Sequence, residues 1–153
     1  YSSAASDVYK RQKNYPIQVV GAALVDDVAT PTRLLIARRS APEALRGLWE
    51  FPGGKVEPGE DDVDGLLREL REELGVEATL TDEVPGPHVQ GWPLNERLAM
   101  RVFVGTVVSG VPRPLEDHSE LVWHRLDDIE GLLGLDWIPA DYPIVEALIH
   151  RLA

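Results

Sequence analysis

The chain has 153 residues, of which 44% are hydrophobic, and 26 acidic residues outnumber 15 basic ones to give a net charge of −11. This length suits one compact domain, and the charge disfavours a nucleic-acid polymer as partner, because such binding depends on basic contacts to phosphates. The absence of cysteine excludes disulfides, thiolate metal sites and a cysteine nucleophile. No apolar run approaches the roughly 20 residues that span a bilayer. We therefore expect a cytoplasmic protein with no membrane partner.

The first twelve residues, YSSAASDVYKRQ, differ in character from the rest of the chain. Residues 6–12 resemble the in-frame translation of an adapter end used in sequencing libraries, and such scars are left out of fold reasoning. An ordinary disordered polar tail is the alternative interpretation. In either case we expect residues 1–12 to be a non-native or disordered leader and residues 13–153 to form a single domain.

The segment that follows predicts two strands and a loop. Residues 17–27, IQVVGAALVDD, are rich in valine and alanine, and residues 33–39, RLLIARR, form a second β-like run. The Asp-Asp to Pro-Thr stretch between them favours a hairpin connection. Residues 41–54 are predicted to be a loop, because Pro52 and the two glycines after it interrupt regular structure.

Residues 61–74, DDVDGLLRELREEL, predict an amphipathic helix, because apolar residues recur at three- and four-residue steps and Gly75 supplies a C-terminal stop. Further strands are predicted at 77–84, 96–110 and 120–126, and a closing helix at 141–152. This order of elements predicts an α/β (α+β) fold in which a mixed sheet is covered by helices on its two faces.

The predicted helix carries an unusual group of carboxylates. Glu69, Glu72 and Glu73 follow one another at i, i+3 and i+4, so they share one helical face. Their mutual repulsion costs free energy unless cations occupy the site, and hard divalent ions prefer carboxylate oxygens. The alternative is a solvated charged face, as charge runs usually are. The turn PGGKVEPGE before the helix favours the metal site, because it lets backbone groups and Glu60 approach the same place.

These residues together resemble the complete signature of the Nudix hydrolase family. Gly54 is followed after five residues by Glu60 and after seven more by RELREELGV, which fills every defined position. The resemblance extends over nearly all of residues 17–152. It implies a Nudix-type α/β/α sandwich in which the signature forms a loop–helix–loop.

The resemblance also implies a role for each residue of the signature. Glu69, Glu72 and Glu73, with the Gly54 carbonyl, would hold divalent ions, Mg²⁺ or Mn²⁺. Glu60 and Arg68 would brace the loop and orient the glutamates, so we treat all five side chains as candidate catalytic residues. Glu73 is our first choice for the ligand nearest the attacking water. Two loop acids are further candidates for metal ligand or general base, or else exposed decoration: Asp117 and Glu120.

The residues before the signature resemble the MutT-type subgroup, which removes pyrophosphate from nucleoside triphosphates, including oxidised guanine nucleotides. In that resemblance Arg39 falls near the phosphate chain, and Glu50 and Phe51 fall beside the base pocket. Core packing is the alternative for Phe51, because aromatic side chains bury large areas in any fold. Arg97 is placed where a pocket arginine could lie, or else on the surface.

Asp141, in the segment DWIPADYP, is the strongest indication of base choice. The segment resembles a turn that presents an asparagine to the base in 8-oxo-guanine sanitisers. An ionised aspartate only accepts hydrogen bonds, whereas asparagine both donates and accepts. This departure leaves CTP or 5-methyl-dCTP open beside 8-oxo-dGTP. A protonated Asp141 would serve both, if desolvation raised its pKa. A helix N-cap is the alternative role.

We therefore expect a Mg²⁺- or Mn²⁺-dependent pyrophosphohydrolase that converts a nucleoside triphosphate to the monophosphate, as a monomer or homodimer. ADP-ribose or a dinucleoside polyphosphate is an alternative substrate, and a non-catalytic nucleotide-binding module is the alternative of another class. His88 and His118 could touch phosphate, but we interpret them as scattered surface residues, and His124 and His150 as structural.

Overall fold

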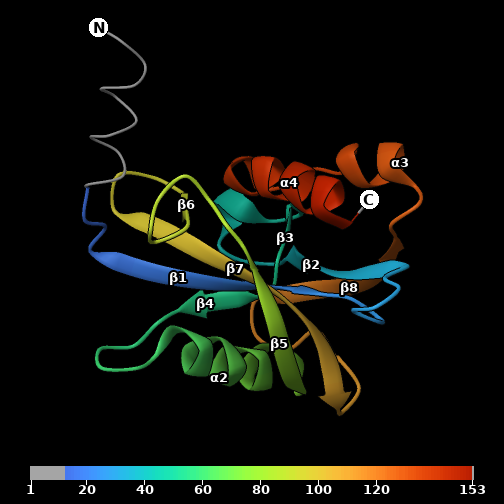
Figure 1. Cartoon of the computed structure of the whole chain (residues 1–153), viewed down its shortest axis with the longest axis horizontal. Coiled ribbons are helices and arrows are strands. Elements are labelled where there is room, and N and C mark those ends of the chain that lie inside the picture. Colours follow the sequence, from blue (N-terminus) through green and yellow to red (C-terminus); the bar gives the residue numbers. More distant parts are fainter. Residues whose placement is uncertain (1–12, 153) are drawn as a thin grey trace, which may run out of the picture.

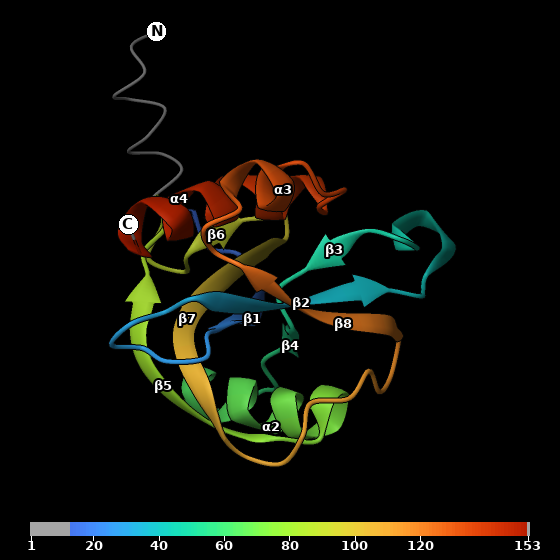
Figure 2. The same cartoon turned by 90° about the vertical axis from the view of Figure 1, so that its right-hand side faces the viewer.

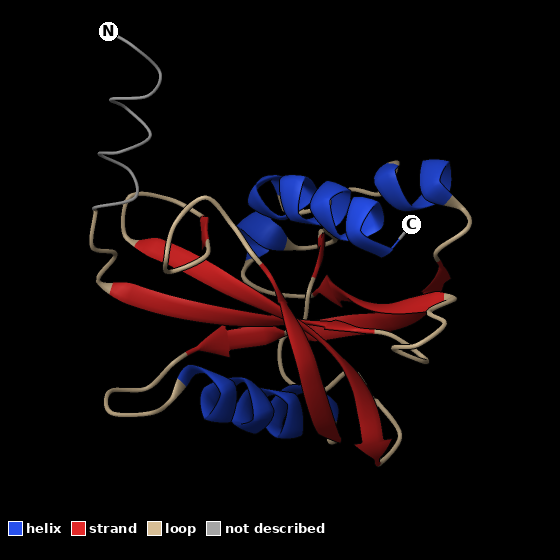
Figure 3. Ribbon diagram, in the orientation of Figure 1, coloured by secondary structure: helices blue, strands red, loops and turns tan. Residues whose placement is uncertain are grey.

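The computed structural model describes residues 13–152, so the leader predicted at residues 1–12 lies outside the described residues. Two layers of helix enclose a central layer of strands (Figures 1 and 3). The elements, in chain order, are β1 (Ile17–Leu24), β2 (Arg33–Arg39), the 3₁₀ turn η1 (Glu43–Leu45), β3 (Trp49–Glu50), β4 (Gly53–Lys55), α2 (Asp62–Leu74), β5 (Glu77–Val84), β6 (Trp92–Pro93), β7 (Leu98–Ser109), β8 (His118–Arg125), α3 (Ile129–Leu133), the 3₁₀ turn η2 (Pro139–Asp141) and α4 (Tyr142–Leu152).

The strands form two sheets. The larger has the order β4-β1-β7-β5, with β6 also paired to β7, and it is mixed because β1 runs parallel to β7. The smaller sheet has the order β3-β2-β8 and is antiparallel. The predicted hairpin connection between β1 and β2 is limited to an antiparallel bridge between Val25 and Leu34 and a hydrogen bond from the Asp26 amide to the Arg33 carbonyl, and the two strands lie in different sheets. Both edges of β1 are already paired, with β4 and β7, so β2 belongs to the other sheet.

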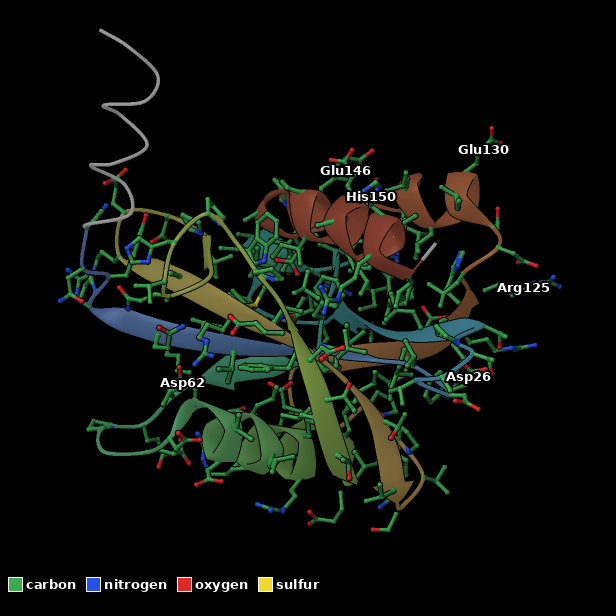
Figure 4. The ribbon with its side chains drawn as sticks, viewed as in Figure 1. Asp26, Asp62, Arg125, Glu130, Glu146 and His150 are labelled. Atoms are coloured by element: carbon green, nitrogen blue, oxygen red, sulfur yellow. The ribbon has the colours of Figure 1, made fainter. Side chains whose placement is uncertain are left out.

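Helix α2 covers one face of the strands, and α3 and α4 cover the other (Figure 2). The α2 helix begins where the Asp61 carboxylate accepts the amide hydrogens of Val63 and Asp64, and it ends at Gly75 in a left-handed conformation. On α4 the labelled side chains of Glu146 and His150 lie on the outer surface (Figure 4). His150 is exposed, so its structural interpretation is wrong.

Each helical layer has its own core. Under α2 the buried residues are Val20, Ala22, Leu24, Leu35, Leu66, Leu70, Leu74, Val76 and Phe103. A larger core that includes Trp49, Phe51 and Trp137 lies beneath α3 and α4. The predicted apolar stripe of the signature helix is therefore confirmed at Leu66, Leu70 and Leu74, and Glu73 is buried beside it.

Short elements account for the remaining differences from the expected fold. The predicted loop 41–54 contains η1, β3 and β4, and neither β6 nor α3 was expected. Elements this short show no periodicity, and their strand pairing comes from neighbours far along the chain. β8 begins at His118 rather than residue 120. No helix within residues 13–152 is long and apolar enough to cross a membrane.

Leu70→Ala should lower the free energy of unfolding by about 2–5 kcal/mol, because the fully buried Leu70 fixes α2 against the sheet and its loss leaves a cavity. Urea unfolding followed by circular dichroism measures this change. Val89→Ala is the control, because Val89 is 82% exposed, and it should stay within about 0.5 kcal/mol of wild type. Equal effects of the two substitutions would contradict this account of the α2 core.

Candidate active site

Two glycines let the β4 backbone pass closely between β1 and α2. A Cβ on Gly53 would lie 1.9 Å from the Val20 carbonyl oxygen, so only glycine fits there without movement of the strands. A Cβ on Gly54 would lie 2.4 Å from Cδ of Glu69. The Glu69 carboxylate is therefore in direct contact with the Gly54 backbone, and oxygen donors from a strand and a helix meet at this point.

Arg68 lies at the centre of the signature's charges. Its Nε donates to Glu60 Oε2 at 2.8 Å, and its Nη1 donates to Glu69 Oε1 at 3.0 Å and to Glu72 Oε2 at 3.1 Å. Nη2 binds the Lys55 carbonyl at 3.1 Å, which fixes the loop to the helix. The hydrogen bonds from Arg68 and from the Glu57 amide lower the pKa of Glu60 to about 2. Glu60 is therefore ionised at any working pH.

Glu73 occupies the buried edge of the same helix. It is 9% exposed and accepts the Gly53 amide hydrogen at 3.3 Å. Burial raises its pKa to about 7, opposed by the charge of His118 and reinforced by the negative charges of Glu50 and Glu69. Burial also raises the pKa of Glu69, against hydrogen bonds from Arg68. The carboxylates thus lie close enough for their charges to act on one another.

The donor set suits a hard divalent ion. Carboxylate oxygens of Glu69 lie beside the Gly54 backbone, and Glu73 Oε2 accepts the amide hydrogen of the preceding Gly53. Such oxygens are the ligands that Mg²⁺ and Mn²⁺ accept. Within residues 13–152, however, no three acidic or histidine side chains converge into a ready-made chelate. Glu69 and Glu72 each bind Arg68 instead. Side-chain rotation at the helix surface is needed before all three glutamates can bind one centre.

A second polar cluster faces Glu73 from the smaller sheet. Arg39 Nη1 donates to Glu50 Oε1 at 3.0 Å, and His118 Nε2 lies 3.2 Å from the same oxygen. The His118 side chain is fully buried, so its interpretation as a surface residue is wrong. The same interpretation is wrong for His88, which is 6% exposed. A β-bulge that the sequence pattern does not reveal turns His118 inward.

Asp141 is buried beside this cluster, at 4% exposure. Its Oδ2 accepts the amide hydrogen of Phe51 at 3.4 Å, and it lies in η2 immediately before α4. Among the described residues, Asp141 does not act as a helix N-cap. Its carboxylate accepts a hydrogen bond from the amide of Phe51, the residue after β3, rather than from an amide of α4. Burial, and then the charge of Glu50, raise the pKa of Asp141 to about 7. The Phe51 ring packs at 5.7 Å from that of Trp137, so its side chain belongs to the core.

The structure does not bring the remaining candidates into direct contact with these clusters. Arg97 is exposed in the turn before β7. Asp117 is exposed with a left-handed backbone, and Glu120 pairs with Arg38 at 3.5 Å. The loop acid whose charge reaches Glu69 is Glu116, which the sequence reasoning missed.

The loop that carries Glu116 is fixed to the end of α2. The Leu115 amide binds the Glu73 carbonyl at 3.0 Å, and the Arg113 amide binds the Leu74 carbonyl at 3.1 Å. Figure 2 shows this orange segment passing the end of the helix. The sequence of this loop gave no signal for which of its acidic residues lies near α2. That placement depends on the loop backbone, which is left-handed at Asp117.

Comparison with known proteins agrees with this geometry. A family model described as the NUDIX domain matches residues 16–148. The chain is 37% identical over 142 residues to the CTP pyrophosphohydrolase of Escherichia coli, covering 87% of this chain and 91% of the relative. It is 38% identical over 109 residues to the putative 8-oxo-dGTP diphosphatase 2 of Mycobacterium tuberculosis, covering 71% and 73%.

Solved structures show the same fold. The solution structure of the E. coli ORF135 protein matches with a TM-score of 0.69 at 35% identity, covering 90% of this chain and 91% of that one. A MutT structure from a study of the Aliivibrio salmonicida and Vibrio cholerae proteins matches with a TM-score of 0.63 at 26% identity. This chain belongs to the Nudix hydrolase family and is similar to its MutT-type members.

Proposed function

We propose that this protein is a divalent-metal-dependent nucleoside triphosphate pyrophosphohydrolase, which converts a nucleoside triphosphate and water to the monophosphate and pyrophosphate. The observation that carries the proposal is the adjacency of two clusters. The oxygen-rich face of Gly54, Glu69 and Glu73 suits phosphate chemistry, and it lies next to the half-buried Glu50 and the buried Asp141, whose carboxyls suit a base edge. The names of the relatives from E. coli and M. tuberculosis support this class of substrate.

Nudix hydrolases generally use divalent metal ions. We propose Mg²⁺, with Mn²⁺ as the alternative, held by the Gly54 carbonyl and by the carboxylates of Glu69, Glu72 and Glu73. Such ions neutralise a pyrophosphate, polarise a phosphoryl oxygen and lower the pKa of bound water. Arg68 and Glu60 act through the glutamates, because their hydrogen bonds set the position of the helix face relative to the loop.

Proton transfer is assigned to the acids at the end of α2. Glu73 is the first candidate to lie beside the attacking water, because it is the buried one of the three helix glutamates and His118 and Glu50 act on its charge. We add Glu116 to Asp117 and Glu120 as candidates for general base or further metal ligand, since its charge reaches Glu69. Alanine substitution of Glu116, Asp117 and Glu120, one at a time, would show which of them hydrolysis requires.

The nucleotide would be read by the second cluster. An ionised Asp141 accepts two hydrogen bonds, which fits the N1–H and N2 amino groups of 8-oxo-guanine. A protonated Asp141 donates one and accepts one, which fits N3 and the N4 amino group of cytosine. Both 8-oxo-dGTP and cytosine nucleotides are therefore proposed substrates, and Arg39, next to Glu50, is proposed to contact the phosphate chain.

The remaining proposals concern the setting. A small-molecule nucleotide, rather than a nucleic-acid polymer or a membrane, fits a chain of net charge −11. We propose a cytoplasmic protein that acts as a monomer or homodimer, with a role in cleaning the nucleotide pool and thereby in DNA repair.

Glu73→Gln should abolish hydrolysis, with kcat lowered about 10³-fold or more, because a neutral amide neither takes up a proton nor binds a divalent ion as a carboxylate does. Pyrophosphate release is measured from 8-oxo-dGTP, dGTP, CTP, 5-methyl-dCTP and ADP-ribose, with Mg²⁺, with Mn²⁺ and with chelator. Glu77→Gln is a matched control, because Glu77 lies beyond the helix and pairs only with Arg71 at the surface.

A wild-type protein that releases pyrophosphate only when a divalent ion is present would support the proposal, and the substrate with the highest kcat/KM would decide the base. Turnover of ADP-ribose alone would replace the nucleoside triphosphate. Absence of turnover with every substrate and both ions would leave the nucleotide-binding module as the function.

Asp141 should make base choice depend on pH. The ratio of kcat/KM for CTP to that for 8-oxo-dGTP should fall as the pH rises from about 6 to 8, because the Asp141 carboxyl loses the proton that cytosine N3 needs. Titration of groups at the metal-holding face affects both substrates alike, so it cancels in the ratio. Asp141→Asn should flatten the ratio over this range, and an equal slope in the two proteins would contradict the assignment.

The same carboxyl gives an independent signal in stability. Its pKa rises from the ordinary 3.8 to about 7 on folding, so the folded state holds the proton while the unfolded state has lost it. This group stabilises the fold below about pH 4, and the contribution is lost as the pH rises through 7. Urea unfolding should therefore show wild-type stability falling relative to Asp141→Asn between those pH values, and a parallel course would sink the assignment.

A further inference from the structure

His118 is turned into the protein by an irregularity in the smaller sheet. Register between β2 and β8 shifts between Arg38 and Arg39, and bulges of this kind re-aim a side chain. Asp117, immediately before His118, has a φ of 55°, a left-handed conformation that few residues other than glycine adopt. The Ser40 amide binds the Asp117 carbonyl at 2.8 Å and holds this backbone in place. The backbone at this point is therefore arranged to bury an imidazole.

Only one of the two nitrogens of the buried His118 ring has a hydrogen-bond partner. Its Nε2 lies 3.2 Å from Glu50 Oε1, and because an ionised carboxylate only accepts, Nε2 is the donor. Its Nδ1 is the one buried side-chain nitrogen or oxygen of residues 13–152 that has no hydrogen-bond partner. A histidine that only filled space could be replaced by an apolar side chain without leaving a polar atom unpaired. The contact with Glu50 is thus the reason to keep a histidine here.

Glu50 receives two donors on one oxygen. Arg39 Nη1 and His118 Nε2 approach Oε1 from two strands, at 3.0 Å and 3.2 Å. This arrangement restrains Oε1, and within residues 13–152 no hydrogen bond to Glu50 Oε2 is formed, which leaves that oxygen for a ligand. Glu50 is only 16% exposed, so its position is set by these neighbours rather than by water. Its charge acts on Asp141 on one side and on Glu73 on the other.

We propose that His118 is a positioning residue for nucleotide recognition, which holds Glu50 so that its free oxygen accepts a hydrogen bond from an amino group of the base. The inference rests on the proposed function and narrows it. The charge of Glu50 acts on the neighbouring Asp141 carboxyl. Two carboxyls placed together suit a base whose edge carries an amino group, as cytosine, guanine and adenine do, and disfavour uracil, whose edge carries none.

Three substitutions of His118 distinguish the contribution of its Nε2 from that of its Nδ1. The amide nitrogen of glutamine lies near the place of Nε2, and that of asparagine lies near the place of Nδ1. His118→Leu should raise KM for CTP about 10-fold with little change in kcat, as expected for loss of a hydrogen bond to a charged group. His118→Gln should stay within about 3-fold of wild type, and His118→Asn should resemble His118→Leu. His124→Gln, on the same strand but half-buried and facing its own backbone, is the control.

The kcat/KM ratio of CTP to UTP and a double-mutant cycle complete the test. The ratio should fall about 10-fold in His118→Leu and be kept in His118→Gln. In a Glu50→Gln background His118→Leu should add less than about 2-fold, since coupled residues are not additive. Equal loss in the glutamine and leucine variants, an unchanged base ratio, or additive losses would overturn the proposal.

Binding of CMP measured by calorimetry needs no turnover and separates this proposal from the proposed function. If the wild type binds CMP and His118→Leu weakens that binding about 10-fold, while no substrate is hydrolysed, the positioning role stands and the hydrolase proposal fails. If pyrophosphate is released by wild type and CMP binds equally to all His118 variants, the hydrolase proposal stands and the positioning role is rejected.

Discussion

The interaction on which the site depends is the attachment of Arg68 to the carboxylates around it. Glutamates at three- and four-residue steps on one helix repel one another, and a guanidinium among them offsets that repulsion with a fixed fork of donors. Arg68 binds Glu60 through two nitrogens and reaches Glu69 and Glu72 through a third. Because it also binds the Lys55 carbonyl, the same side chain that balances charge on the helix determines where the loop lies.

Packing decides how each glutamate of that helix behaves. The stripe that buries Leu66 and Leu70 turns past Glu73, which is 9% exposed, whereas the side chain of Glu72 is 47% exposed. Desolvation therefore raises the pKa of Glu73. A helix rotated by one residue would exchange these environments, so the apolar contacts of α2 specify the chemistry of its polar face.

The sequence predicts the structural features that depend on periodic patterns or on residues close together along the chain. The bounds of β2 and β5 and the apolar stripe on α2 follow from periodicity and local turns, and each agrees with the structure. The division into two sheets does not follow, because it depends on β1 pairing with β7 about 80 residues later. His118 was misjudged for the same reason, since a bulge against β2 and not its neighbours in the chain buries it.

The acidic side chains of this site thus differ in pKa because their surroundings differ. Two donors hold Glu60 at a pKa of about 2, while Asp141, buried with one long amide contact and facing the charge of Glu50, has a pKa of about 7. Glu50 differs from Asp141 in its partners, because Arg39 and His118 supply it with hydrogen-bond donors that Asp141 lacks. Asp141 both donates and accepts when it is protonated, and it only accepts once the pH has risen through its pKa of about 7. Under the proposed function, Glu50 would accept a hydrogen bond from the amino group of a base, and the contact of Asp141 with the ring nitrogen would depend on pH.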